Sequence, residues 1–272
     1  MSFWENILRF LDTGMEVPQP YGWFHLLWLA LTVAATVVLC VLYKKGIVRN
    51  VRGVVLITAI IVTVLEVYKQ INFSFRYEDG IHAAYQWYAF PWQFCSMPMY
   101  VGLLAGLTKG RLHRALCAFL ASYAVFAGAI VMLVPTSVFT YAIGINIQTM
   151  ICHGSMITIG AFLMYTGYVK PQHTTVLRAM PVFAVGIALA LAINWMGHNL
   201  QIMGGGSLNS FFICPECPPH LPVYSEVQKV LPGWLSIVVY VAGFTLASYL
   251  MVLTGIVSKK LFGSKKTEKA VV

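Results

Sequence analysis

Seven stretches of the chain are long and apolar enough to cross a lipid bilayer, because a spanning helix needs about 20 mostly apolar residues. They run from Trp23 to Tyr43, Val54 to Phe75, Tyr85 to Leu107, Leu112 to Val134, Ile145 to Val169, Val176 to Leu200 and Pro232 to Val257. Only 10% of the 272 residues are charged, against about a quarter in soluble domains. We expect an all-α polytopic membrane protein, a seven-transmembrane helical bundle.

The basic residues predict how this bundle is oriented, since lysine and arginine collect near helix ends on the cytoplasmic side. Fourteen of the 18 basic residues lie in four segments, Lys44 to Arg52, Lys109 to Arg114, Lys170 to Arg178 and Lys259 to Lys269. These segments follow the first, third, fifth and seventh stretches. The N-terminus is therefore predicted outside and the C-terminus in the cytoplasm. Short clusters between apolar runs also argue against nucleic acid as a partner, despite the net charge of +9.

The domain organisation follows from the same pattern. Residues 1–22 lack a basic start and a cleavage site, so they are predicted to form an N-terminal interfacial helix rather than a signal peptide. Residues 23–257 form the transmembrane domain, which includes an exoplasmic Cys-, Pro- and Gly-rich loop at 201–231. Residues 258–272 form a basic cytoplasmic tail.

Polar side chains inside the predicted spans are few, and such groups usually face a bundle interior or a water-filled cavity. They are His25, Glu66, Lys69, Gln70, Gln93, Cys95, Asn146, Gln148, His153, Asn194, His198 and Asn199. At about 1.5 Å per residue, Cys95 lies roughly 12 Å from Trp87 and His153 roughly 12 Å from Ile145, the residues near which their spans enter the membrane from outside. We expect Cys95 and His153 to face each other in the outer half of the membrane.

A cysteine beside a histidine can perform covalent acyl transfer. The histidine takes the thiol proton, the thiolate attacks an acyl carbonyl, and the acyl group rests as a thioester. We predict Cys95 and His153 as the catalytic residues. The supporting polar layer is His25, Glu66, Gln70, Gln93, Asn194 and His198.

Within that layer Asn194 or Gln93 is a candidate oxyanion donor, and Glu66 is a candidate group to orient the imidazole. Each residue also has a structural interpretation. His25 is equally suited to anchor the interface, Glu66 to neutralise Lys69 one turn away, and Asn194 to make a packing hydrogen bond between helices.

Several segments resemble the YwaF-type bacterial integral membrane proteins. They are Phe24 to Trp28, Glu66 with Gln70, Pro91 to Met97, the segment around His153 and Asn194-Trp195, in the same order. That group is similar to a vertebrate transmembrane cysteine acyltransferase of ether phospholipids. The resemblance implies that Cys95 carries the acyl group and that His153 is its histidine. It also implies a bacterial cytoplasmic membrane as the location. Gln93-Phe94 stands where many bacterial members have Leu-His.

The exoplasmic loop carries Cys-Pro-Glu-Cys at Cys214 to Cys217. In an oxidising compartment a disulfide between Cys214 and Cys217 is the simpler interpretation. The alternative is a metal site that adds His220, with His198 as a fourth ligand. We expect no metal and no cofactor.

The leading hypothesis is a phospholipid acyltransferase whose partners are membrane phospholipids and lysophospholipids. With water as the acceptor, the same site would make a lipid hydrolase. A transporter or channel also needs a polar intramembrane cavity, and a membrane sensor would carry a polar network without chemistry. Against transport, the sequence shows no inverted repeat and no spanning helices broken by Gly or Pro. The oligomeric state is left open.

Overall fold

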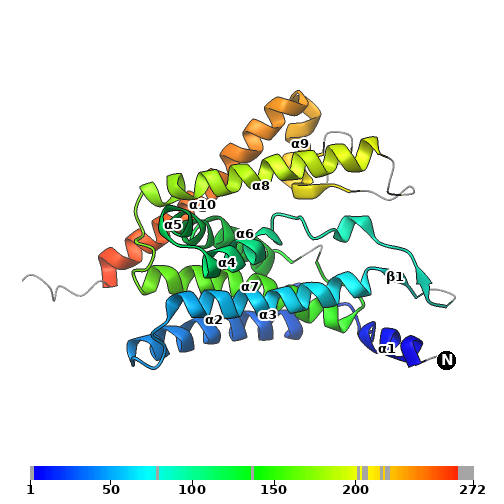
Figure 1. The fold of residues 1–272 in the computed structure, drawn as a ribbon, viewed down its shortest axis with the longest axis horizontal. Coiled ribbons are helices and arrows are strands. Elements are labelled where there is room, and N and C mark those ends of the chain that lie inside the picture. Colours follow the sequence, from blue (N-terminus) through cyan, green and yellow to red (C-terminus); the bar gives the residue numbers. More distant parts are fainter. Residues whose placement is uncertain are drawn as a thin grey trace, which may run out of the picture.

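The computed structural model describes residues 3–77, 80–135, 138–200, 203, 208–214, 217 and 221–262. Their regular secondary structure is almost entirely helical, and the exception is a small antiparallel hairpin of β1 (Phe75–Arg76) and β2 (His82–Ala83). Several of the long helices run side by side along the longest axis of the molecule (Figure 1). The prediction of an all-α bundle is confirmed.

Six helical stretches among the described residues are long and apolar enough to cross a membrane. They are α2 (Trp23–Lys44), α3 (Val51–Asn72), α5 (Gly110–Leu120) with α6 (Tyr123–Leu133), α7 (Ile143–Tyr165), α8 (Thr174–Asn199) and α10 (Gly233–Phe262). They correspond to six of the seven predicted spans, and they support an integral membrane protein. The orientation of the chain across the bilayer stays a prediction.

The third predicted span, Tyr85 to Leu107, is not a long helix, so the prediction of seven such helices was wrong. A short 3₁₀ turn, η1 (Trp87–Ala89), is followed by irregular chain and then by α4 (Met97–Leu107). Eleven residues of α4 are about 16 Å long, half of the roughly 30 Å hydrocarbon layer.

Two prolines explain why this stretch is interrupted. Proline disfavours helical geometry in the preceding residue, and Phe90, just before Pro91, is extended (φ −49°, ψ 134°). Pro98 then lies in the first turn of α4, where a missing N–H costs nothing. Cys95 consequently lies in a turn before α4 rather than inside a helix. The depth calculated for it from a helical rise does not apply.

The fourth predicted span is also interrupted, between α5 and α6. Ser122 has a non-helical backbone (φ −133°, ψ −80°), and its hydroxyl donates to the Ala118 carbonyl oxygen at 2.6 Å. Ala121 and Ser122 are fully buried, which is where irregular backbone is tolerated at membrane depth. One predicted span is thus broken at a proline, Pro91, whereas the break at Ser122 involves neither Gly nor Pro.

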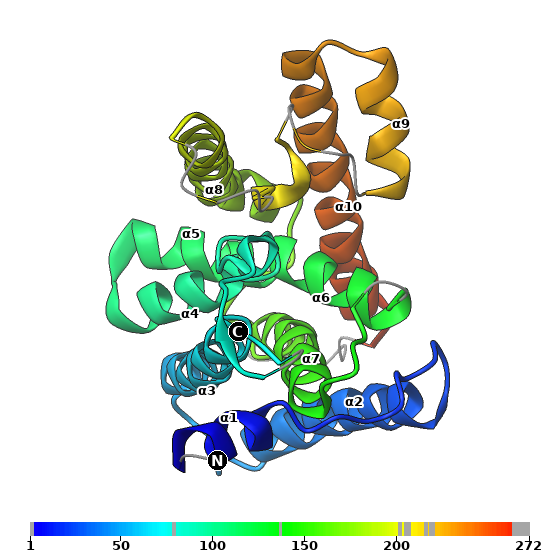
Figure 2. The same cartoon turned by 90° about the vertical axis from the view of Figure 1, so that its right-hand side faces the viewer.

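Seen along the bundle, α7 packs against α2, α3 and α6, while α8 and α10 form the opposite side (Figure 2). Helix α6 approaches α7 closely because Gly128 has no side chain. A Cβ atom there would lie 2.5 Å from the His153 carbonyl oxygen. Small residues permit such close helix packing in membranes. The turn of α7 that carries His153 is therefore held directly against α6.

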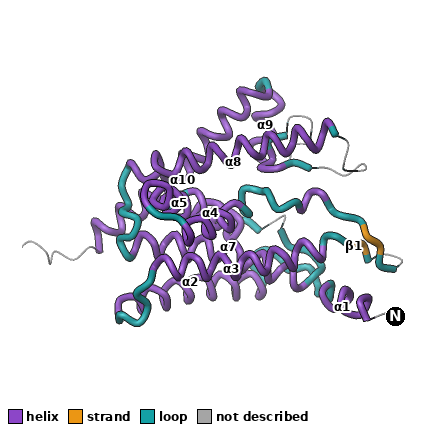
Figure 3. Tube along the Cα trace, viewed as in Figure 1, coloured by secondary structure: helices purple, strands orange, loops and turns teal. Residues whose placement is uncertain are grey.

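The chain outside the spans adds two short helices and a turn. Helix α1 (Phe3–Leu11) lies in the region predicted as an interfacial helix, and Phe3 and Trp4 on it are each 70% exposed. The predicted exoplasmic loop contains η2 (Ser210–Phe212) and α9 (Pro222–Val230). The tube in Figure 3 shows how little of the described chain is strand.

Candidate functional site

Cys95 directly precedes Ser96, the N-cap residue of α4. The side chain of Cys95 is partly exposed, whereas Phe94 and Ser96 on either side are buried. The Phe94 ring packs edge-on against Phe183 and Phe244, with centroids 5.6 and 4.9 Å apart. This aromatic anchor fixes the turn. The N-terminus of α4, the positive end of its dipole, therefore lies next to Cys95.

Three helices surround the Cys95 thiol. The charges of Glu66 and Lys69 on α3 act on it, and a negative charge on Cys95 acts in turn on Cys152 of α7 and Tyr240 of α10. Cys152 is the neighbour of His153 in the sequence, and Lys69 acts on His153 as well. The fold thus brings the cysteine and histidine segments, which are far apart in the sequence, to the same part of the bundle.

His153 is 6% exposed, and its Nδ1 lies 2.7 Å from the Thr149 carbonyl oxygen. A carbonyl oxygen only accepts, so Nδ1 carries the proton and Nε2 has a free lone pair. This Nε2 is buried and has no hydrogen-bond partner among the described residues. No hydrogen bond joins Cys95 and His153 within the described part of the chain. Catalytic hydrogen bonds are often long before substrate binds, so this does not separate the pair functionally.

Glu66 and Gln70 belong to a polar network that ties α3 to its neighbours. Glu66 accepts hydrogen bonds from Gln70 (2.8 Å) and Gln148 on α7 (3.4 Å), and it pairs with Lys69 at 2.8 Å. Gln70 also donates to the Ala89 carbonyl oxygen at 2.9 Å. Glu66 makes no hydrogen bond to His153, so the backbone of α7 orients the imidazole instead.

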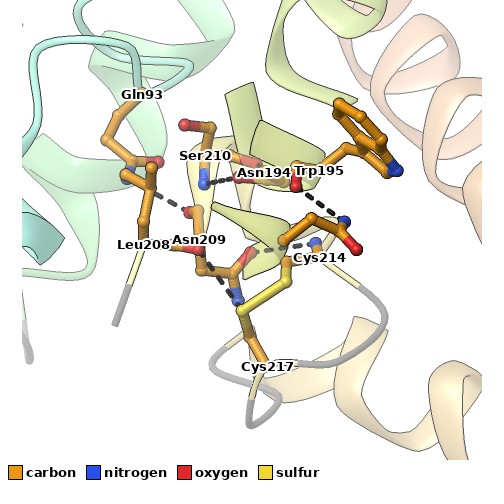
Figure 4. Close-up of a disulfide and its surroundings, with 9 residues drawn as sticks. Gln93, Asn194, Trp195, Leu208, Asn209, Ser210, Cys214 and Cys217 are labelled. Carbon is orange, nitrogen blue, oxygen red and sulfur yellow. Dashed lines mark hydrogen bonds between the residues drawn. A yellow bond between two sulfur atoms is a disulfide. The ribbon is translucent and has the colours of Figure 1, made fainter. Parts of the chain in front are cut away.

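Gln93 and Asn194 hold the exoplasmic loop in place (Figure 4). Asn194 donates to the Ser210 carbonyl oxygen at 3.1 Å and accepts from the Ser210 N–H at 2.7 Å. Gln93 donates to the Asn209 carbonyl oxygen at 3.1 Å and accepts from the Phe211 N–H at 3.0 Å. Both amide groups are therefore held in place by the loop, each through one N–H and its carbonyl oxygen, and their role as oxyanion donors stays a prediction.

The same loop contains a disulfide between Cys214 and Cys217, whose Cα atoms are 5.3 Å apart (Figure 4). The Asn209 side chain accepts a hydrogen bond from the Cys214 N–H at 3.0 Å. No group of three or more His, Cys, Asp or Glu residues suited to a metal occurs in the described chain. His220, the third ligand of the alternative metal site, lies outside the described residues.

The structure does not bring His25 or His198 to the cysteine. His25 is fully buried, accepts from the Tyr21 N–H at 2.9 Å and donates through Nε2 to the Met132 carbonyl oxygen at 2.8 Å. Both ring nitrogens are used to join the start of α2 to α6. His198 lies exposed in the last turn of α8.

Sequence reasoning missed Tyr240, a buried residue of α10 beside Cys95. Its only signal in the sequence is a single hydroxyl in an apolar run, Ile237 to Val241. Nothing in that run indicates which part of the protein lies next to Tyr240.

Two cavities lie near these residues. A cavity of about 30 Å³ between α3, α4 and α7 includes Cys152 and Ser155 in its lining. A larger one, of about 740 Å³, lies between α8 and α10. Its lining is mostly apolar and includes Val176, Met180 and Val241. It also includes His173, whose Nδ1 is 2.7 Å from the Tyr249 hydroxyl.

Comparison with known proteins identifies one family. The TMEM164 family profile matches residues 20–254, which include all six long helices almost completely, the Cys95 turn and the disulfide loop. No curated protein and no solved structure shows a significant match. The family found differs in name from the YwaF-type group, so the bacterial location stays a prediction. A match over this much of the sequence shows that the chain belongs to the TMEM164 family.

Proposed function

We propose that this protein is an integral membrane phospholipid acyltransferase that forms an acyl thioester on Cys95, with His153 as the general base. The observation that carries the proposal is the state of His153. Its Nδ1 proton is held by Thr149, and its Nε2 is a buried acceptor without a partner among the described residues. An unsatisfied buried polar group costs about 1 to 3 kcal/mol, so it calls for an explanation, and a catalytic role is one such explanation.

The reaction follows from this arrangement in balanced steps. His153 Nε2 accepts the Cys95 proton, and the thiolate sulfur attacks the carbonyl carbon of a phospholipid ester. The C–O bond of the ester then breaks, and the leaving lysophospholipid oxygen takes the proton back from the imidazole. In the second half, the hydroxyl of an acceptor lysophospholipid gives its proton to His153 and its oxygen attacks the thioester carbonyl. The C–S bond then breaks, and the Cys95 sulfur takes the proton from the imidazole.

Two further observations support a lipid substrate. The cysteine lies within a bundle of long apolar helices, and the cavity between α8 and α10 has an apolar lining suited to an acyl chain. We place the site in the outer half of the bilayer, with the N-terminus outside, because the basic segments mark the other end as cytoplasmic.

The test is to incubate purified protein with a labelled phospholipid, quench the reaction and search by mass spectrometry for a hydroxylamine-sensitive acyl group on Cys95. Cys95→Ala should abolish the adduct, and His153→Gln should slow its formation about 100- to 10,000-fold. Cys40→Ala, which changes a free cysteine on α2, is the matched control and should behave as the wild type.

An adduct on another cysteine, or none on the wild-type protein, would contradict the proposal. Release of the labelled acyl group as free fatty acid, with no transfer to added lysophospholipid, would instead identify a hydrolase.

A further inference from the structure

A second buried polar atom beside Cys95 has no partner. Among the described residues, six buried side-chain atoms lack a hydrogen-bond partner, and four belong to segments outside the long helices: Tyr77, Asn209, Ser210 and Gln228. The remaining two are His153 Nε2 and the Tyr240 hydroxyl. Both belong to long helices. Tyr240 stacks on Phe244, which contacts the Phe94 ring, and His153 follows Cys152, on which the Cys95 charge acts.

The position of Tyr240 is fixed by aromatic packing. Its ring stacks on Phe244 with centroids 4.1 Å apart and an angle of 22°, and Phe244 also receives the Phe94 ring at 4.9 Å. Phe94 is the residue before Cys95, so one phenylalanine holds both the cysteine turn and Tyr240. Tyr240 is 3% exposed, and a negative charge on Cys95 acts on its hydroxyl.

We propose that Tyr240 is a catalytic residue whose hydroxyl donates a hydrogen bond to the oxyanion formed when Cys95 attacks an acyl carbonyl. This inference rests on the proposed function. A buried phenol without a partner is costly in the resting protein, but it becomes paired when an oxyanion forms nearby. Such a donor stabilises the transition state more than the ground state, which is the requirement for catalysis.

The step balances without any further reactant. The thiolate forms the C–S bond, the electron pair of the C=O bond moves to oxygen, and the Tyr240 O–H donates to that oxygen while keeping its proton. When the tetrahedral intermediate collapses, the electron pair returns to carbon and the ester C–O bond breaks. The amide groups of Gln93 and Asn194 are tied to the loop around Ser210, whereas the Tyr240 hydroxyl has no partner among the described residues.

Tyr240→Phe removes the hydroxyl and keeps the ring. We expect the single-turnover rate of Cys95 acylation to fall about 100- to 1,000-fold, the effect of removing one oxyanion donor. Binding of a non-hydrolysable ether phospholipid should not change, because it develops no oxyanion. The thermal midpoint should stay the same or rise, since an unpaired buried group has been removed.

The matched control is Tyr224→Phe. Tyr224 packs against Tyr240 with centroids 5.1 Å apart, but its hydroxyl lies 3.2 Å from Ser236 Oγ, an ordinary structural contact. This variant should acylate at the wild-type rate.

An unchanged acylation rate in Tyr240→Phe, with the adduct still on Cys95, would overturn the role of Tyr240 alone. A loss of rate accompanied by an equal loss of ether phospholipid binding would show a binding role and also overturn it. The absence of any Cys95 adduct in the wild type would overturn the proposed function instead.

Discussion

His153 Nδ1 lies 2.7 Å from the carbonyl oxygen of Thr149, one turn earlier on α7, and this contact fixes which ring nitrogen is free to accept a proton. Histidines that act as bases are usually oriented by a carboxylate or a carbonyl group on the second nitrogen. The carboxylate of Glu66 is occupied by Gln70, Lys69 and Gln148. The backbone therefore takes the orienting role that the sequence suggested for Glu66.

A substitution distinguishes the two roles considered for His25, a structural role and membership of the polar layer around the catalytic residues. His25→Leu would leave the Tyr21 N–H and the Met132 carbonyl oxygen unpaired, so we expect a loss of about 1 to 3 kcal/mol in the free energy of unfolding. Denaturation in detergent micelles measures it. The Cys95 acylation rate per folded molecule should not change.

His198→Leu, at an exposed position on α8, is the control and should alter neither quantity. A His25→Leu protein of normal stability that no longer forms the Cys95 adduct would instead assign His25 to the catalytic site.

The ion pair on α3 gives a second prediction. Glu66 and Lys69 have side chains only 7% and 16% exposed, so Glu66→Gln leaves a poorly solvated ammonium group without its partner. We expect a loss of about 3 to 5 kcal/mol in stability, measured by denaturation in micelles. The double variant Glu66→Gln/Lys69→Met should recover most of that loss because it removes both charges. If the stability losses of Glu66→Gln and Lys69→Met alone add up to the loss of the double variant, the pair contributes nothing to stability.

The disulfide loop allows the predicted orientation to be tested. Cys214 and Cys217 are bonded to each other, so a thiol reagent should label them only after reduction. A membrane-impermeant maleimide should label reduced intact cells, because residues 201–231 are predicted to be exoplasmic. The variant Cys214→Ser/Cys217→Ser is the control and should not be labelled. Labelling that requires permeabilised cells would reverse the predicted topology.

The cavity between α8 and α10 predicts a site of substrate selection. Ala242 lines it, and Ala242→Trp would fill part of its roughly 740 Å³. We expect the acylation rate with long-chain phospholipids to fall about 10-fold or more relative to short-chain ones, the usual effect of pocket size on specificity.

Val239→Trp changes a 39% exposed residue of the same helix outside the cavity, and it is the control. Equal effects of the two variants on every chain length would show that the cavity does not hold the acyl chain.

The sequence by itself determined the class of protein and the extent of most helices. Backbone N–H and C=O groups in lipid must be hydrogen-bonded within the protein, and a run of about 20 apolar residues achieves this as a helix. Six of the predicted runs form such helices. It also singled out Cys95, His153 and Glu66, because polar groups in apolar runs are costly and therefore conspicuous.

Only the tertiary structure decided where α4 begins, what each polar group contacts, and which groups remain unpaired. Pro91 and Pro98 were visible in the sequence, but apolarity alone cannot distinguish a full span from an irregular turn buried by neighbours. Asn194 and Tyr240 show the same limit. Asn194 is hydrogen-bonded to a loop, whereas the Tyr240 hydroxyl, whose ring stacks on Phe244, has no partner among the described residues. Hydrogen bonding between distant segments depends on tertiary packing, which local sequence patterns do not encode.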